Sequence, residues 1–223
     1  MTTRQLLSAA LAAVACIAAG ALLWRAATDK PADGPVDIYL GDQRLSVPIA
    51  YIRFESARLG GRLEKLDLAA RATNFLPAAT GANNGPRGKS GGEIVFLSLS
   101  PPSGTLAPAD RTARLYSRFL ETPHWNHPGG LIKRRFQKDS PYPNEDLFLA
   151  PPEGRRFAAR YLRPRNLPKD LPENLPKKLP STCLADLRLG NVDVQLRFTA
   201  ALLPQWEHLH AGAHGLLQSF IRK

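Results

Sequence analysis

Cysteine is scarce in this sequence: only two of its 223 residues are cysteine. Cys16 lies in an apolar N-terminal run and Cys183 lies far along the chain. The rest of the chain can therefore form no internal disulfide and no cysteine-rich zinc site. Cys183 falls in an alternating, strand-like pattern, which predicts a buried thiol. A chain of this length can still bury a core without such cross-links.

Acidic residues are also few. The chain has 19 Asp and Glu against 30 Lys and Arg, a formal net charge of +11. Excess positive charge attracts nucleic acid, acidic phospholipid headgroups or acidic glycans. Few aromatic residues lie among the basic ones, so binding of nucleic acid is not indicated. For a tethered domain the nearest anionic surface is its own membrane, and a solvated basic surface is the alternative. The candidate residues for an anionic or membrane surface are Arg111, Arg114, Arg118, Lys133, Arg134 and Arg135.

Motifs that would name a reaction are missing. The sequence has no G-x-S-x-G elbow for a serine nucleophile. Glu145 and Asp146 are adjacent in a strand pattern and point to opposite faces, so they cannot form an acid/base pair. We expect them to cap a nearby element or to pair with nearby arginines. Glu207, His210 and His214 are spaced on one helix so that they could chelate a metal, and solvated or boundary histidines are the alternative. We expect no cofactor and no metal site.

The stretch "GANNGPRGKSGG" ends like a phosphate-binding loop, at Gly88-Lys89-Ser90. The glycine that this motif needs five residues before Gly88 is Asn83. A strand pattern also follows the loop, whereas phosphate binding requires the N-terminus of a helix there. The stretch therefore predicts a loop between two strands and no nucleotide site.

The N-terminus, residues 1–27, is typical of an export signal. No charge interrupts residues 5–24, which are 20 in number; as a helix they would cross a hydrocarbon core of about 30 Å. The apolar residues continue to Trp24, which favours an uncleaved signal-anchor in the inner membrane. A signal peptide cleaved after Gly20 and a lipoprotein signal at Cys16 remain open. In each case the rest of the chain is exported, and we expect it in a bacterial periplasm after a polar linker, 28–35.

Residues 36–223 predict one α+β domain with a mainly antiparallel sheet of six or more strands. Two short strands should flank Gly41-Asp42, and the strongest hairpin should turn at Gly190-Asn191. Further strands are expected at 66–68, 93–100, 130–136, 145–150 and 155–162. The core should contain Leu66, Leu68, Val95, Leu97, Phe119, Phe148, Phe157, Leu187, Val194, Leu196, Phe198 and Trp206.

Two helices should pack on this sheet. One begins with Asp110 as its N-cap and ends at Pro123, with His124 and His127 in the turn that follows. The other closes the chain, with Leu202, Trp206, Leu209, Ala213, Leu217 and Phe220 on one face. Gly212 and Gly215 should weaken it by about 1 kcal/mol each relative to alanine. A Leu-Pro repeat at 166–180 predicts an extended loop between strands, and a docking segment for a partner is the alternative.

Three stretches, "IYLGDQRLSVPIAYIRF", "SPYPNEDLFLA" and "LRFTAALLPQWEHL", together resemble uncharacterised exported proteins of proteobacteria. The resemblance implies export and a single domain, and it transfers no site residues. We therefore expect a membrane-anchored periplasmic interaction domain without catalysis, with an envelope protein as its partner. The alternatives are a periplasmic metal-dependent hydrolase of envelope material, which would use the C-terminal histidines, and an immunity or inhibitor protein.

Overall fold

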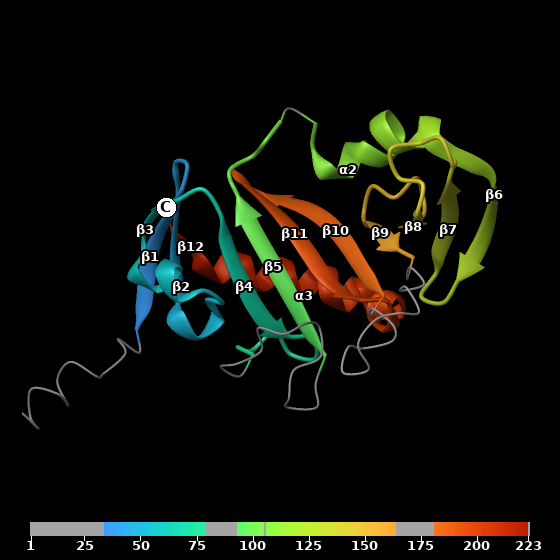
Figure 1. Ribbon diagram of the computed structural model, residues 1–223. Helices are drawn as coiled ribbons and strands as arrows, with labels where there is room; N and C mark the ends of the chain where they lie inside the picture. The colour runs from blue at the N-terminus through green and yellow to red at the C-terminus, as the bar shows by residue number, and fades with distance from the viewer. Residues whose placement is uncertain (1–33, 79–92, 105, 164–180, 223) are drawn as a thin grey trace, which may run out of the picture. The chain divides into compact units, whose positions relative to one another are not determined.

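The computed structural model describes residues 34–78, 93–104, 106–163 and 181–222 (Figure 1). Three sequence predictions lie outside these residues: the signal-anchor within 1–27, the Gly-Lys-Ser loop and the Leu-Pro repeat at 166–180. Among the described residues, no helix is both long and apolar enough to cross a membrane. By contacts, Pro35–Lys223 forms one unit, distinct from Met1–Gly34.

An eight-stranded sheet dominates the fold. Its strand order is β4-β5-β11-β10-β9-β8-β7-β6, and every neighbouring pair is antiparallel, which confirms the predicted α+β class. The strands are β4 (Leu66–Arg71), β5 (Ile94–Ser100), β6 (Leu120–His127), β7 (Leu131–Phe136), β8 (Glu145–Leu149), β9 (Ala158–Leu162), β10 (Thr182–Leu189) and β11 (Val192–Thr199).

The β10–β11 hairpin lies in the middle of the sheet. Its register pairs Leu187 with Val194 around the predicted turn, where Gly190 has a φ of 56°. Cys183 is fully buried on this hairpin, as predicted, and burial raises the pKa of its thiol to about 12. Strand β9 pairs directly with β10, Leu162 opposite Thr182. The Leu-Pro insert therefore joins two strands that are neighbours in the sheet.

A second, smaller sheet has the order β12-β2-β1-β3. It contains β1 (Pro35–Leu40), β2 (Gln43–Pro48), β3 (Gly61–Leu63) and β12 (Ile221–Arg222). The strands on either side of Gly41-Asp42 form the predicted hairpin, while β1 pairs with β3 in parallel. Period-2 patterns identify strands but not the sheet to which each belongs, so this second sheet was not predicted.

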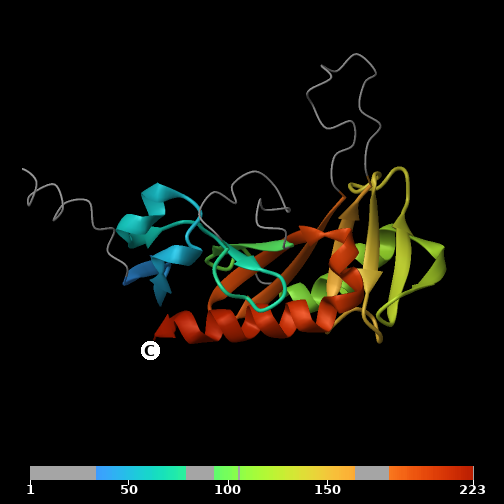
Figure 2. The same ribbon diagram turned by 90° about the horizontal axis from the view of Figure 1, so that it is seen from below.

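Helix α3 (Trp206–Phe220) lies along one face of the large sheet (Figure 2). A 3-10 turn, Ala200–Gln205, leads into it. The apolar residues predicted to share its face are all buried and belong to the same core cluster as Val95, Leu97 and Leu196. Of the residues predicted for the core, Phe119 alone is only half-buried.

The other face of the sheet is partly covered by the segment Pro108–Phe119, which comprises α2 (Pro108–Arg111), a π-helical turn (Thr112–Tyr116) and a 3-10 turn (Ser117–Phe119). Tyr116 packs there with Phe136 and Leu147 in a second core cluster. Strand β8 shows that the two clusters lie on opposite faces, because Phe148 belongs to the first and Leu147 to the second.

The interior helix is shorter than predicted. It ends at Phe119, and Leu120 begins edge strand β6, where it pairs with Phe136 of β7. Pro123 does not end a helix but lies in this edge strand, where proline is tolerated because one side of the strand lacks a partner. His124 and His127 therefore lie in a strand and not in a turn. Asp110 is not the N-cap: Ala107 holds that position without a side-chain hydrogen bond.

Candidate binding surface

Strands β4, β5, β11 and β10 carry α3 on one face and polar side chains on the other. We call this second face the open face; its polar residues include Asp67, Ser98, Asp186, Asp193 and Gln195, all half-buried. Since side chains alternate between the two faces of a strand, the apolar neighbours of these residues fill the core below. Between the open face and α2 lies a cleft of about 220 Å³, to which Lys65, Arg111 and Ser100 also contribute.

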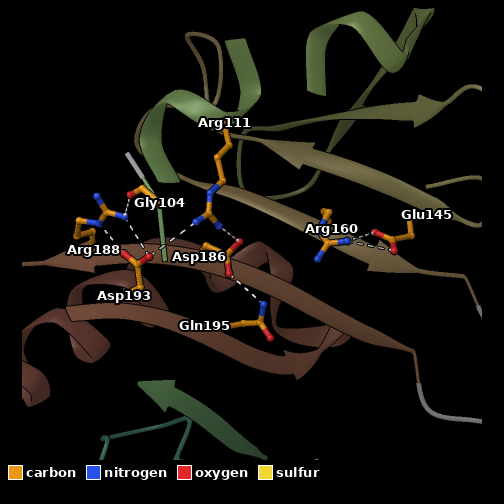
Figure 3. A network of polar contacts seen from close by, with 8 residues as sticks. All are labelled: Gly104, Arg111, Glu145, Arg160, Asp186, Arg188, Asp193 and Gln195. Carbon is orange, nitrogen blue, oxygen red and sulfur yellow. Dashed lines mark hydrogen bonds and ion pairs between the residues drawn. The ribbon is translucent and has the colours of Figure 1, made fainter. Parts of the chain in front are cut away.

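Arg111 ties α2 to the open face (Figure 3). Its Nη1 lies 2.6 Å from Asp186 Oδ2, and its Nη2 lies 3.9 Å from Asp193 Oδ2. Gln195 donates its Nε2 to the other oxygen of Asp186 at 3.1 Å. The side chains of Arg111 and Asp186 are about a fifth to a quarter exposed, so water screens this pair only in part. The ion pairs of Arg111 thus hold α2, on one side of the cleft, to strands β10 and β11 on the other.

A second arginine closes the network at the hairpin turn (Figure 3). Arg188 binds Asp193 through Nε at 2.5 Å and through Nη2 at 3.0 Å. Nη2 also donates to the carbonyl oxygen of Gly104 at 3.2 Å. The hydrogen bond with Asp193 raises the pKa of Arg188. Bidentate guanidinium–carboxylate pairs of this kind fix geometry as well as charge.

The carboxylates of the neighbouring strands are also paired. Glu145 accepts hydrogen bonds from Arg160 Nη1 at 3.0 and 3.2 Å, and the buried Asp146 pairs with Lys133 at 3.1 Å and with Arg163 at 3.2 Å. Both acids thus pair with basic side chains, as predicted. These pairs link β7, β8 and the end of β9 through their side chains.

The remaining basic candidates make contacts of different kinds. Arg134 donates to the carbonyl oxygen of Glu121 at 3.1 Å, and Arg135 stacks on the partly exposed Trp125, 4.8 Å from the ring centroid. Arg118 donates back to carbonyl oxygens of its own helical segment, and Arg114 is exposed. With Arg111 and Lys133 engaged in ion pairs, the six residues do not combine into one free basic patch.

The C-terminal histidines differ in their contacts. Burial, together with the nearby charges of His214 and Arg156, lowers the pKa of His210. Glu207 pairs instead with Arg156 at 3.3 Å, and a ring nitrogen of His208 lies 2.9 Å from the carbonyl oxygen of Ala72. Within the described residues, no three His, Cys, Asp or Glu side chains gather as metal ligands would.

Sequence reasoning did not single out Asp186, Arg188 and Asp193. The sequence did contain a sign of the pair formed by Arg188 and Asp193. In the predicted hairpin these two residues lie opposite each other beside the two-residue turn, and opposite charges at such positions attract. The contact with Arg111 joins residues 75 positions apart, and no periodicity in the sequence reports it.

The chain matches no protein-family model and no curated protein significantly. Its fold is similar to that of Smlt3025, an immunity protein of the Stenotrophomonas maltophilia type IV secretion system, with a TM-score of 0.60 and 15% identity over 86% of this chain and 94% of that one. FrpD, an iron-regulated outer membrane lipoprotein of Neisseria meningitidis, matches over 86% of this chain and 95% of its own, with a TM-score of 0.47 and 11% identity.

Proposed function

We propose that this chain is a non-catalytic binding protein of the immunity type, which neutralises a protein partner by occupying it. The observation that carries the proposal is the similarity of fold to an immunity protein over 86% of the chain and 94% of the other. The likeness extends across the whole domain rather than to one motif, which is what a shared architecture for presenting a binding surface would require.

The chemistry of the open face supports the same proposal. Asp186 and Asp193 are paired with arginines in a fixed arrangement, which offers a partner a preformed pattern of both charges. Complementary charge patterns give protein interfaces their specificity and speed of association. The open face is hollowed by the cleft beside α2, so a side chain of the partner can insert there.

We further propose that residues 5–24 anchor the chain in the bacterial inner membrane and that the folded domain lies in the periplasm. The basis is the uncharged run between Arg4 and Arg25. A topology reporter fused after Lys223 should be active only outside the cytoplasm. Activity confined to the cytoplasm would rule out this location and leave the proposal of partner binding to its own test.

The partner proposal is tested by neutralisation. The products of genes adjacent to this one are each expressed in the periplasm, with and without the full-length chain. We expect one product to inhibit growth, the chain to relieve the inhibition, and the two proteins to co-purify.

Gln195→Arg places a bulky cation in the cleft and should abolish relief. Arg114→Gln, at an exposed position off the open face, serves as the matched control and should not. Bound zinc in the purified chain, with a hydrolase activity lost in His210→Ala and His214→Ala, would instead establish the metal-hydrolase alternative.

A further inference from the structure

Two arginines meet on one aromatic ring of the open face. Phe96 of β5 points away from the α3 core, as the alternation with Val95 and Leu97 requires. The Cζ atom of Arg53 lies 4.2 Å from its ring centroid and that of Arg197 lies 4.9 Å from it. Arg53 lies between two 3-10 turns, Ile49–Tyr51 and Glu55–Leu59, and Arg197 projects from β11 opposite Phe96. We call these three residues the Arg53–Phe96–Arg197 clamp.

The clamp holds more positive charge than its surroundings neutralise. Within the described part of the chain, neither Arg53 nor Arg197 forms an ion pair, and the buried Nε–H of Arg53 has no acceptor. Burial, and after it the charge of Arg197, lowers the pKa of Arg53. The sequence between Ala78 and Glu93 contains no Asp or Glu that could supply a carboxylate.

Asp67, the acidic residue whose charge acts on Arg53, already has other partners. Asp67 accepts a hydrogen bond from Ser98 and pairs with Lys65 at 3.4 Å; its charge favours the protonated Arg53 without forming an ion pair with it. A buried donor without an acceptor costs free energy, and two like charges on one ring repel each other. The repulsion is relieved by one external oxyanion placed beside the two guanidinium groups.

We propose that the Arg53–Phe96–Arg197 clamp binds a carboxylate side chain from an acidic segment of the protein partner, a role that rests on the proposed function. Guanidinium groups match the planar, two-oxygen geometry of a carboxylate. The contact with Phe96 holds both guanidinium groups in place, and Arg197 is exposed and can donate to a partner.

The charge around the clamp favours a protein over a membrane. The same face carries Asp67, Asp186 and Asp193 beside its arginines, and a sheet of anionic headgroups would approach these acids as closely as the clamp. A protein segment can place a single carboxylate at the clamp and other groups elsewhere. Phe54, next to Arg53 in the chain and 48% exposed, adds an apolar contact that suits a peptide chain.

The test follows the Nε–H resonance of Arg53 in the ¹⁵N-labelled full-length chain in detergent. Hexaglutamate peptide is titrated against hexaglutamine peptide at constant ionic strength. We expect a saturable shift of this resonance with hexaglutamate only, because the guanidinium group that carries it gains a negatively charged neighbour. Arg197→Gln, an exposed strand position, should weaken the apparent affinity about tenfold through the loss of charge-assisted contacts.

Arg118→Gln is the matched control, because Arg118 also stacks on an aromatic ring but donates to its own helix; it should leave the affinity unchanged. The proposal is overturned if hexaglutamate causes no saturable shift or if Arg197→Gln binds as well as the unmodified chain. It is also overturned if inorganic phosphate or phosphatidylglycerol vesicles shift the resonance at lower concentrations of charge than the peptide. A saturable shift in a chain that neutralises no neighbouring gene product would leave the clamp intact and reject the immunity role.

Discussion

Gly212 lies on the side of α3 that meets Phe75. A Cβ added at Gly212 would lie 2.2 Å from two ring carbons of Phe75, whereas one added at Gly215 meets nothing within 4 Å. Phe75 is buried, and its backbone has a φ of 54°, so the ring is held by its own turn and by the helix. The glycine that helix propensity disfavours is therefore required by packing.

Gly212→Ala and Gly215→Ala should consequently have opposite effects. Gly215→Ala should raise the free energy of unfolding by up to about 1 kcal/mol, since alanine favours the helix. Gly212→Ala should lower it by about 1–3 kcal/mol because the added methyl group displaces the ring. Urea unfolding of the two variants measures both changes, and equal stabilisation by both would show that Phe75 does not press on the helix.

His210 should make stability depend on pH. Its pKa in the folded chain lies below the ordinary value of 6.5, mainly because of burial. Below pH 6.5 the unfolded chain binds a proton at this residue more readily than the folded chain does, so the contribution of neutral His210 is present above that pH and is lost as the pH falls.

The free energy of unfolding should therefore decrease from pH 7.5 to pH 5.5, and His210→Gln should reduce that decrease. Chemical unfolding at both pH values measures it. His124→Gln, on the exposed edge strand β6, controls for removing any histidine. If the two variants change the pH dependence equally, His210 is not its source.

At the scale of elements, Arg111 is the main polar link between α2 and the large sheet. Arg111→Gln would leave Asp186 with only the hydrogen bond from Gln195. We expect the free energy of unfolding to fall by about 1–3 kcal/mol, since a half-buried carboxylate loses its charged partner.

Arg114→Gln, on the exposed side of the same segment, should change stability by less than about 0.5 kcal/mol. Thermal and urea unfolding compare the two variants. If Arg111→Gln is as stable as Arg114→Gln, the apolar contacts of Tyr116 and Phe136 alone hold the segment on the sheet.

The elements that sequence reasoning identified are those whose pattern is local. The β10–β11 hairpin combines strict alternation with a two-residue turn, and α3 repeats its apolar residues at helical spacing, so each was predictable without its neighbours. The segment Pro108–Phe119 was not, because its end is set by Leu120 pairing with Phe136 across β6 and β7. That tertiary contact outweighs the helix propensity of the residues around it.

The candidate site divides in the same way. The outward pair of Arg188 and Asp193 follows from the turn at Gly190-Asn191 and was readable from the sequence. The clamp joins Arg53, Phe96 and Arg197, which come from three distant stretches, and nothing local links them. The fold class could thus be predicted from the periodic spacing of apolar residues. The site could not, because it depends on which strands become neighbours in the sheet.

At the scale of the whole molecule, the net charge of +11 does not correspond to one attractive patch among the described residues. Arg111, Arg160 and Arg188 are bound to acids, while Arg53 and Arg197 retain free charge beside them on the open face. The partner binding proposed above would use such a distribution, because paired charges fix the shape of a surface and a few unpaired ones attract. This favours a protein partner over bulk binding to anionic polymers.

The Leu-Pro insert offers the last test, because it separates folding from binding. Strands β9 and β10 are adjacent and antiparallel, with Leu162 opposite Thr182, so a short turn can join them. Loop length changes closure entropy only slowly. Replacing residues 166–180 with a four-residue glycine-rich turn should therefore change the free energy of unfolding by less than about 1 kcal/mol.

The shortened chain should also keep the hexaglutamate-induced shift of Arg53, because no residue of the clamp lies on β9 or β10. Urea unfolding and the same titration measure the two properties. An unfolded product would show that the insert is needed for the fold. A folded product that no longer binds hexaglutamate would show that the insert, rather than the open face alone, contacts the acidic segment.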